Sequence, residues 1–130
     1  MKNKFNEMKY TGRGEAMCLL SCGSFKGRNY VICNRGGMFP VAYVEALPED
    51  PKLYDSSVEL GDDFRHITFG PESPTVRGVK LQHLYWGWSY SQEGDAMNID
   101  GDEIPGKEYT EEDVYQDVLE FILRINSNNI

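Results

Sequence analysis

"RNYVICNRGGMFPVAYVEAL", residues 28–47, decides the fold because it has the pattern of a β-hairpin. Two apolar runs, 28–33 and 38–47, flank the tetrapeptide "NRGG" at 34–37. Asn and Gly tolerate positive φ, so this tetrapeptide makes a good turn. Pro40 cannot donate to a neighbouring strand, which places it near the start of its strand or at an edge.

Three more strands are predicted around this hairpin. "EAMCLLSC" (15–22) is a short apolar run between Gly-rich turns, and "FRHITFG" (64–70) follows the hairpin. "VKLQHLYWGWSYS" (79–91) is the fifth strand. In the fourth strand, side-chain alternation predicts that Ile67 and Phe69 lie on the same face. In the fifth strand the same alternation predicts one shared face for Leu84, Trp86, Trp88 and Tyr90.

The segments between these strands are expected to be loops. Two prolines, several acids and a Gly in 48–63 indicate a long loop, and loops of that length are often functional. Residues 71–78 form a connector. The polar stretch 92–109 is expected to be a loop, with "NIDGDE" (98–103) as a turn because it lacks the Gly and Glu spacing of an EF-hand.

The last segment, "TEEDVYQDVLEFILRI" (110–125), predicts an amphipathic helix. Thr110 is the expected N-cap, and Asp113 three residues later completes a capping-box-like start. One apolar face follows from the helical period: Val114, Val118, Phe121, Ile122 and Ile125. We therefore expect a single α+β domain over 1–130, a mostly antiparallel sheet of about five strands packed by a C-terminal helix.

Composition limits the class of protein. The chain has 130 residues, of which 40% are hydrophobic, which suits one folded domain. No apolar run approaches the roughly 20 residues that span a bilayer, and the basic start "MKNKFNEMKY" leads into no signal-peptide block. These features predict a cytoplasmic protein without membrane contact.

Metal and cofactor binding are not expected. The three cysteines, Cys18, Cys22 and Cys33, form no CxxC pair and are predicted to be buried free thiols. His66 and His83 are not spaced as a ligand set. No GxSxG elbow or P-loop is present, so no catalytic residue can be named and enzymatic activity stays open.

The net charge of −8 is unevenly spread along the chain. Residues 1–44 hold seven Lys and Arg against two Glu, a balance of +5, whereas 91–130 hold two against eleven acids, a balance of −9. An acidic protein repels phosphate backbones, so direct nucleic-acid binding is disfavoured. The acidic charge indicates either a surface for a basic partner protein or a means of staying soluble.

The aromatic stretch "YWGWSYSQEGD" (85–95) allows two interpretations. Its aromatic stripe is either a core face under the helix or the wall of a ligand pocket rimmed by polar groups. The residues predicted to bind a partner or ligand are Trp86, Trp88, Tyr90, Gln92, Glu93, Asp95, Asp100, Asp102 and Glu103.

Three stretches, 39–54, 65–70 and 85–95, with the helix after them, resemble a group of small uncharacterised phage and mobile-element proteins. That group shows a Tyr-Val strand followed by a proline step, a His-Gly-Gly-like strand and an aromatic-Gly-aromatic-Asp stretch ending in His-x-Gly-Asp. Here Ser89 stands at the Asp position, Gln92 and Glu93 replace the His element, and the His-Gly-Gly element is reduced to "FRHITFG". What persists is structural and aromatic, so the resemblance implies binding rather than catalysis.

Three functions follow from these observations. The first is a small acidic phage- or mobile-element-type protein that inhibits a host protein with a basic surface, such as a nuclease or other defence component, in the cytoplasm of a bacterial host. The second is a small-molecule-binding domain or small enzyme with an aromatic pocket. The third is a self-assembling accessory protein, a homo-oligomer that uses an exposed sheet edge.

Overall fold

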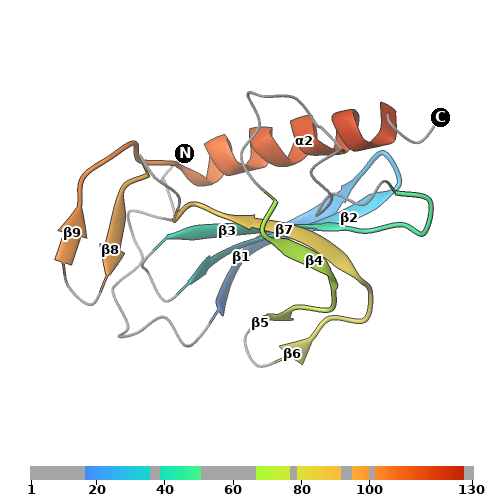
Figure 1. Cartoon of the computed structure of the whole chain (residues 1–130), viewed down its shortest axis with the longest axis horizontal. Coiled ribbons are helices and arrows are strands. Elements are labelled where there is room, and N and C mark those ends of the chain that lie inside the picture. Colours follow the sequence, from blue (N-terminus) through green and yellow to red (C-terminus); the bar gives the residue numbers. More distant parts are fainter. Residues whose placement is uncertain are drawn as a thin grey trace.

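The chain forms an α+β fold in the computed structural model, which describes residues 17–35, 39–50, 67–76, 79–91, 95–99 and 102–127 (Figure 1). The elements are β1 (Met17–Phe25), β2 (Arg28–Arg35), β3 (Pro40–Glu45), β4 (Phe69–Glu72), β5 (Thr75–Val76), β6 (Val79–Lys80), β7 (Tyr85–Ser89), β8 (Met97–Ile99), β9 (Asp102–Ile104) and α2 (Glu111–Ser127). Five of them make one antiparallel sheet in the order β1-β2-β3-β7-β4. In Figure 1, α2 lies across one face of this sheet and the β5–β6 pair lies on the other side. The predicted fold class is confirmed.

The first hairpin differs from its prediction in length. β1 does not end at residue 22 but continues to Phe25, which pairs with Arg28 across a two-residue turn. Lys26 and Gly27 have φ of 50° and 85°, and positive φ at both positions matches the twist of a tight hairpin. Gly23 pairs with Tyr30 in this longer strand, and the Tyr30 side chain lies so close to it that a side chain at position 23 would collide.

The pairing of the second hairpin, β2–β3, is confirmed, but Asn34 and Arg35, which were predicted as turn residues, belong to β2, and residues 36–38 lie outside the described residues. Pro40 begins β3 opposite Asn34, the position expected for a residue that cannot donate to the ladder. β3 then pairs with β7, so that Ala42 faces Trp88. Every residue of β3 from Pro40 to Val44 is buried, as is usual for a strand covered on both faces.

The C-terminal helix begins and packs as predicted. The backbone N–H of Asp113 donates to the Thr110 hydroxyl at 3.0 Å, and the N–H of Thr110 donates to the Asp113 carboxylate at 2.9 Å. This reciprocal capping box satisfies two backbone donors that the helix leaves unpaired. The five residues of the predicted apolar face are buried: Val114, Val118, Phe121, Ile122 and Ile125.

Two cores lie on opposite faces of the sheet. The helix-side core joins the apolar face of α2 to side chains of β2, β3 and β7, with Tyr90 just beyond: Ile32, Ala42, Val44, Trp86, Trp88 and Tyr90. The second core, on the other face, has fewer buried side chains and is partly covered by the β5–β6 pair: Val31, Cys33, Val41, Tyr43, Val76 and Tyr85.

The predicted fourth strand starts later than expected. β4 covers 69–72, and residues 64–66 lie outside the described residues. Ile67 packs against the helix-side core and Phe69 against the second core, so the prediction that they share a face is wrong. β4 approaches β7 so closely that a side chain at Gly70, whose φ is 110°, would collide with the Tyr85 carbonyl oxygen.

The predicted fifth strand is two strands. Residues 79–80 form β6, which pairs with β5. β5 lies within residues 71–78, the segment that was expected to be a connector. Because β6 and β7 belong to different sheets, the chain bends at Gln82 and His83 between them. Leu84 therefore precedes β7 and is 51% exposed, so it does not share the buried face of Trp86, Trp88 and Tyr90 as predicted.

The segment expected to be a polar loop, 92–109, contains the β8–β9 hairpin. Met97 pairs with Ile104 and Ile99 with Asp102, while the two residues between the strands, 100–101, lie outside the described residues. An Asp-Gly pair between short alternating segments is a strong hairpin signal, and it outweighs the polar composition.

The prediction that the cysteines are buried free thiols is confirmed for Cys33 and is wrong for Cys22. Cys33 is buried in the second core, whereas Cys22, on the edge strand β1, is exposed. An edge strand presents part of its surface to solvent, which explains the difference.

Candidate functional site

The predicted aromatic stripe lies in the core. Trp86, Trp88 and Tyr90 are 3%, 1% and 0% exposed, and all three pack under α2. The Trp88 ring lies 5.0 Å from the ring of Phe121 between centroids. Of the two interpretations of the stripe, the structure supports the core under α2.

The polar atoms of this stripe are satisfied inside the protein. Trp88 Nε1 donates to Tyr90 Oη at 3.2 Å, and the Tyr90 hydroxyl donates to Asp117 of α2 at 2.6 Å. The Tyr109 ring packs on Tyr90 at 4.7 Å. A buried chain of this kind fixes how α2 sits on the sheet.

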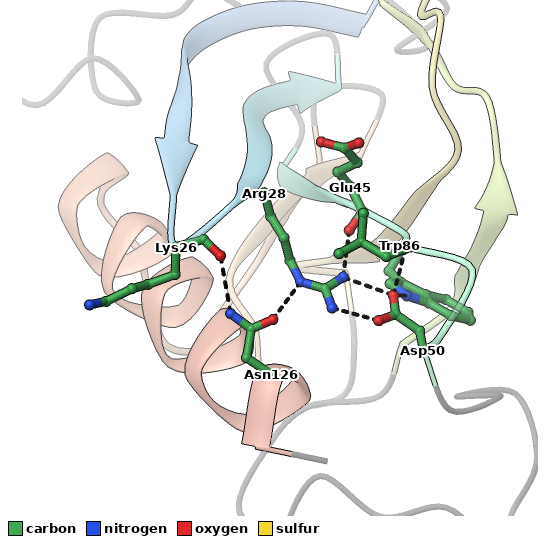
Figure 2. Close-up of polar contacts among 7 residues, drawn as sticks. Lys26, Arg28, Glu45, Asp50, Trp86 and Asn126 are labelled. Atoms are coloured by element: carbon green, nitrogen blue, oxygen red, sulfur yellow. Dashed lines mark hydrogen bonds and ion pairs between the residues drawn. The ribbon is translucent and has the colours of Figure 1, made fainter. Parts of the chain in front are cut away.

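Trp86 belongs to a second polar network, centred on Arg28 (Figure 2). The guanidinium of Arg28 forms a bidentate pair with the Asp50 carboxylate. Its Nε also donates to Asn126 Oδ1 at 2.8 Å, and its Nη1 donates to the Glu45 carbonyl oxygen at 2.8 Å. Arg28 thus connects the start of β2 to the end of β3 and to the end of α2.

Asp50 is held from three sides. Its Oδ2 accepts hydrogen bonds from the Leu47 backbone N–H at 2.8 Å and from Trp86 Nε1 at 2.9 Å, besides Arg28 (Figure 2). The side chains of Arg28 and Asp50 are 0% and 1% exposed. A buried charge is tolerated only when it is paired and hydrogen-bonded, and both conditions are met here. This network is structural, and no local sequence pattern pairs residues 22 positions apart.

The predicted acidic site residues that remain lie on an acidic arm, by which we mean the β8–β9 hairpin and residues 105–113. In Figure 1 this hairpin stands at one end of the molecule, beside the start of α2. All three residues of β9 are exposed. Exposed acidic side chains on the arm are Asp102, Glu103, Glu108, Glu112 and Asp113.

The two ends of the hairpin in the acidic arm are joined to each other, and Tyr109 connects the arm to the core. Asp95 and Lys107 form an isolated parallel bridge, and the Ala96 N–H donates to the Lys107 carbonyl oxygen at 2.9 Å. The Lys107 ammonium lies 4.9 Å from the centroid of the Tyr109 ring, which itself packs on Tyr90 of the core. The two ends of the hairpin are therefore closed by a backbone bridge, the Tyr109 ring contacts the helix-side core, and β9 is exposed.

The nine predicted site residues thus separate into groups. Trp86, Trp88 and Tyr90 are core residues, Asp95 is 4% exposed at the base of the arm, and Asp102 and Glu103 share its outer strand. Three lie outside the described residues: Gln92, Glu93 and Asp100.

A pocket on the second core was not predicted. It has a volume of about 240 Å³ and is open to solvent, beside the end of β2, the start of β3 and the end of β7. Its lining combines aromatic rings, hydroxyl groups and one cation: Arg35, Phe39, Val41, Tyr43, Thr68, Phe69, Trp88, Ser89 and Ser91. The alternation of Phe39, Val41 and Tyr43 can be recognised in the sequence, but the sequence does not show which strands lie beside theirs in the sheet.

Tyr43 is the strongly perturbed titratable group of this pocket. Burial raises the pKa of its hydroxyl to about 12, the nearby Cys33 thiol also raises it, and Arg35 acts to lower it. A tyrosine hydroxyl is protonated near neutral pH even at its ordinary pKa, so this group is available as a hydrogen-bond donor.

Other chemistry is limited in the part of the chain that the structure describes. No three His, Cys, Asp or Glu side chains there gather closely enough to hold a metal ion. No helix in the same ranges has the length and apolar character needed to cross a lipid bilayer. No protein-family model, curated protein or solved structure matches the chain.

Proposed function

We propose that this protein is a binding protein that engages a partner protein with a basic surface through its acidic arm. The observation that carries the proposal is the exposure of every residue of β9 on a hairpin whose two ends are joined by a backbone bridge. Residues 95–113 hold eight acidic residues and one lysine. Such a concentration of one charge steers a basic partner toward the arm and disfavours nucleic acid.

The arm also offers an apolar contact among its charges. Ile104, at the end of β9, is 39% exposed, and the Pro105 that follows it is exposed too. Interfaces commonly place an apolar anchor at their centre and polar groups at their rim. In β9, Ile104 is such an apolar residue, and Asp102 and Glu103 are the charged residues next to it.

The bridge between the two ends of the hairpin favours tight binding. Ordering a loop on binding costs free energy, so a segment that is already held in place loses less of its interaction energy. The Ala96–Lys107 hydrogen bond and the Tyr109–Tyr90 packing hold the two ends of the arm before any partner arrives.

The partner class we propose is a host protein with a basic groove, such as a nuclease or another defence component, which the protein inhibits. A basic groove that binds phosphates is complementary to a row of carboxylates. The resemblance to phage and mobile-element proteins supports a host protein as the target.

Charge removal on the arm tests this proposal. The double substitution D102N/E103Q should weaken binding to a partner purified from bacterial lysate by about tenfold, because two exposed carboxylates of β9 are neutralised. Neither side chain has a structural contact among the described residues, so the fold should be kept. The matched control E49Q/E72Q removes two exposed charges elsewhere.

Dissociation constants from titration calorimetry decide the outcome. The proposal requires that the control stay within about twofold of the unmodified chain and that raising the salt concentration reduce the difference between the variants. The proposal would be refuted if both double substitutions weakened binding equally or if neither weakened it.

A further inference from the structure

We propose that the pocket on the second core binds a small aromatic carboxylate, with Arg35 holding the carboxylate and Tyr43, Phe69 and Phe39 enclosing the ring. This site lies on the face of the sheet opposite α2 and does not depend on the acidic arm. It is therefore a second binding function beyond the one proposed above.

The register of the sheet explains why a hollow forms there. Phe39, Val41 and Tyr43 point to one face because they are two residues apart in an extended chain. Val41 pairs with Ser89 of β7, so the two rings stand on either side of two smaller side chains. The smaller pair forms the floor, and the rings form the walls.

The inner wall is a packed aromatic pair. Tyr43 and Phe69 lie on either side of Gly87, which pairs with both of them. A side chain at Gly87 would meet the Tyr43 ring at 2.7 Å, so that ring covers the backbone of β7. The Tyr43 and Phe69 rings meet edge to face with centroids 5.3 Å apart and an angle of 72°. A third ring entering the pocket would find both an edge and a face.

Arg35 supplies the charge. It is the last residue of β2, is exposed, and lines the pocket beside Phe39, whose carbonyl oxygen accepts its backbone N–H at 2.9 Å. Within the described ranges no carboxylate pairs with its guanidinium, and no lining residue is acidic. A guanidinium binds a carboxylate through two parallel hydrogen bonds, so an anion of that shape complements the pocket.

Hydroxyl groups complete the site. The Tyr43 hydroxyl is protonated at neutral pH, and Tyr43 and Arg35 both line the pocket and interact electrostatically. Ser89 of the floor and Ser91 also line the pocket, with their hydroxyl oxygens 2.7 Å apart. These groups can bind a ring substituent such as a hydroxyl.

The volume restricts the ligand to a single ring. About 240 Å³ is below the roughly 300–1,000 Å³ of pockets for drug-sized molecules, so a benzoate-sized acid suits it. Each part of such a ligand then has a partner: the carboxylate at the rim, the ring between the walls and a substituent at the serines.

Titration with benzoate and 4-hydroxybenzoate, followed by NMR of the backbone amides, tests the proposal. We expect saturable shifts at Tyr43, Phe69 and Ser89. Benzamide, which keeps the ring but has no charge, should bind about tenfold more weakly than benzoate because a charge-assisted pair is lost.

Substitutions at Arg35 test whether its guanidinium binds the carboxylate of the ligand. R35Q should weaken benzoate binding by about tenfold, and R35K should fall between, since lysine keeps the charge without the planar fork. The matched control K80Q, an exposed cation on β6, should leave binding unchanged. Absence of saturable shifts at the pocket, equal binding of benzamide, or an R35Q variant that binds like the unmodified chain would each overturn the proposal.

Discussion

Arg28 and Asp50 show how one pair of residues can hold several elements together. Both side chains are buried, and their partners come from β3, β7, the 46–50 turn and the end of α2. Burying two charges is costly, so their hydrogen bonds offset a penalty before they add stability. The expected effect of losing one partner is therefore larger than that of losing an exposed ion pair.

Replacing Asp50 with Asn tests this directly. D50N leaves the Arg28 charge buried without a counter-charge and should lower the free energy of unfolding by about 3–5 kcal/mol. The control E120Q breaks the exposed Glu120–Arg124 pair on α2 and should cost only about 0.3–0.5 kcal/mol. Urea unfolding of both variants measures the difference, and similar costs would contradict a stabilising role for the buried pair.

At the scale of elements, α2 depends on how its first turn is capped. Thr110 and Asp113 each accept a backbone hydrogen bond from the other, just before the apolar face of the helix begins. The cap also joins the helix to the acidic arm, because residues 105–110 connect β9 to α2. A loosened cap should therefore disturb the base of the arm as well as the helix.

T110A is the matching experiment. Removing the hydroxyl should cost about 1 kcal/mol, as for other N-cap substitutions, and should increase amide exchange in the first turn of α2. Q116A, on the exposed side of the same helix, serves as the control, since its side chain bonds only Glu112 among the described contacts. If exchange increased equally along the whole helix in both variants, the cap would not have the local role assigned to it.

At the scale of the whole molecule, the elements with strong local signals could be predicted from the sequence. The helix followed from its period of apolar residues and the β2–β3 pairing from two apolar runs around a Gly-rich segment, and both elements are confirmed. The break between β6 and β7 could not be predicted, because the apolar pattern runs through it and only the pairing of β6 with β5 bends the chain.

Of the two candidate sites, one could be predicted from the sequence and the other could not. The exposed acids of β9 were predicted from charge alone, which needs no knowledge of the fold. The pocket could not be predicted, since Arg35, Phe69 and Ser89 come from three strands and meet only through the register of the sheet. The aromatic stripe misled in part because the same residues suit a core and a binding site equally well.

The most direct test of the central claim is to map the surface that a captured partner covers. Backbone amide shifts of the labelled chain should change at β8, β9 and residues 105–113 when the unlabelled partner is added. These changes should weaken as salt rises from about 0.1 M to about 1 M, where the screening length falls from roughly 10 to 3 Å. A footprint centred on the exposed edge of β1 or on the pocket around Arg35, with the acidic arm unchanged, would contradict the proposed function.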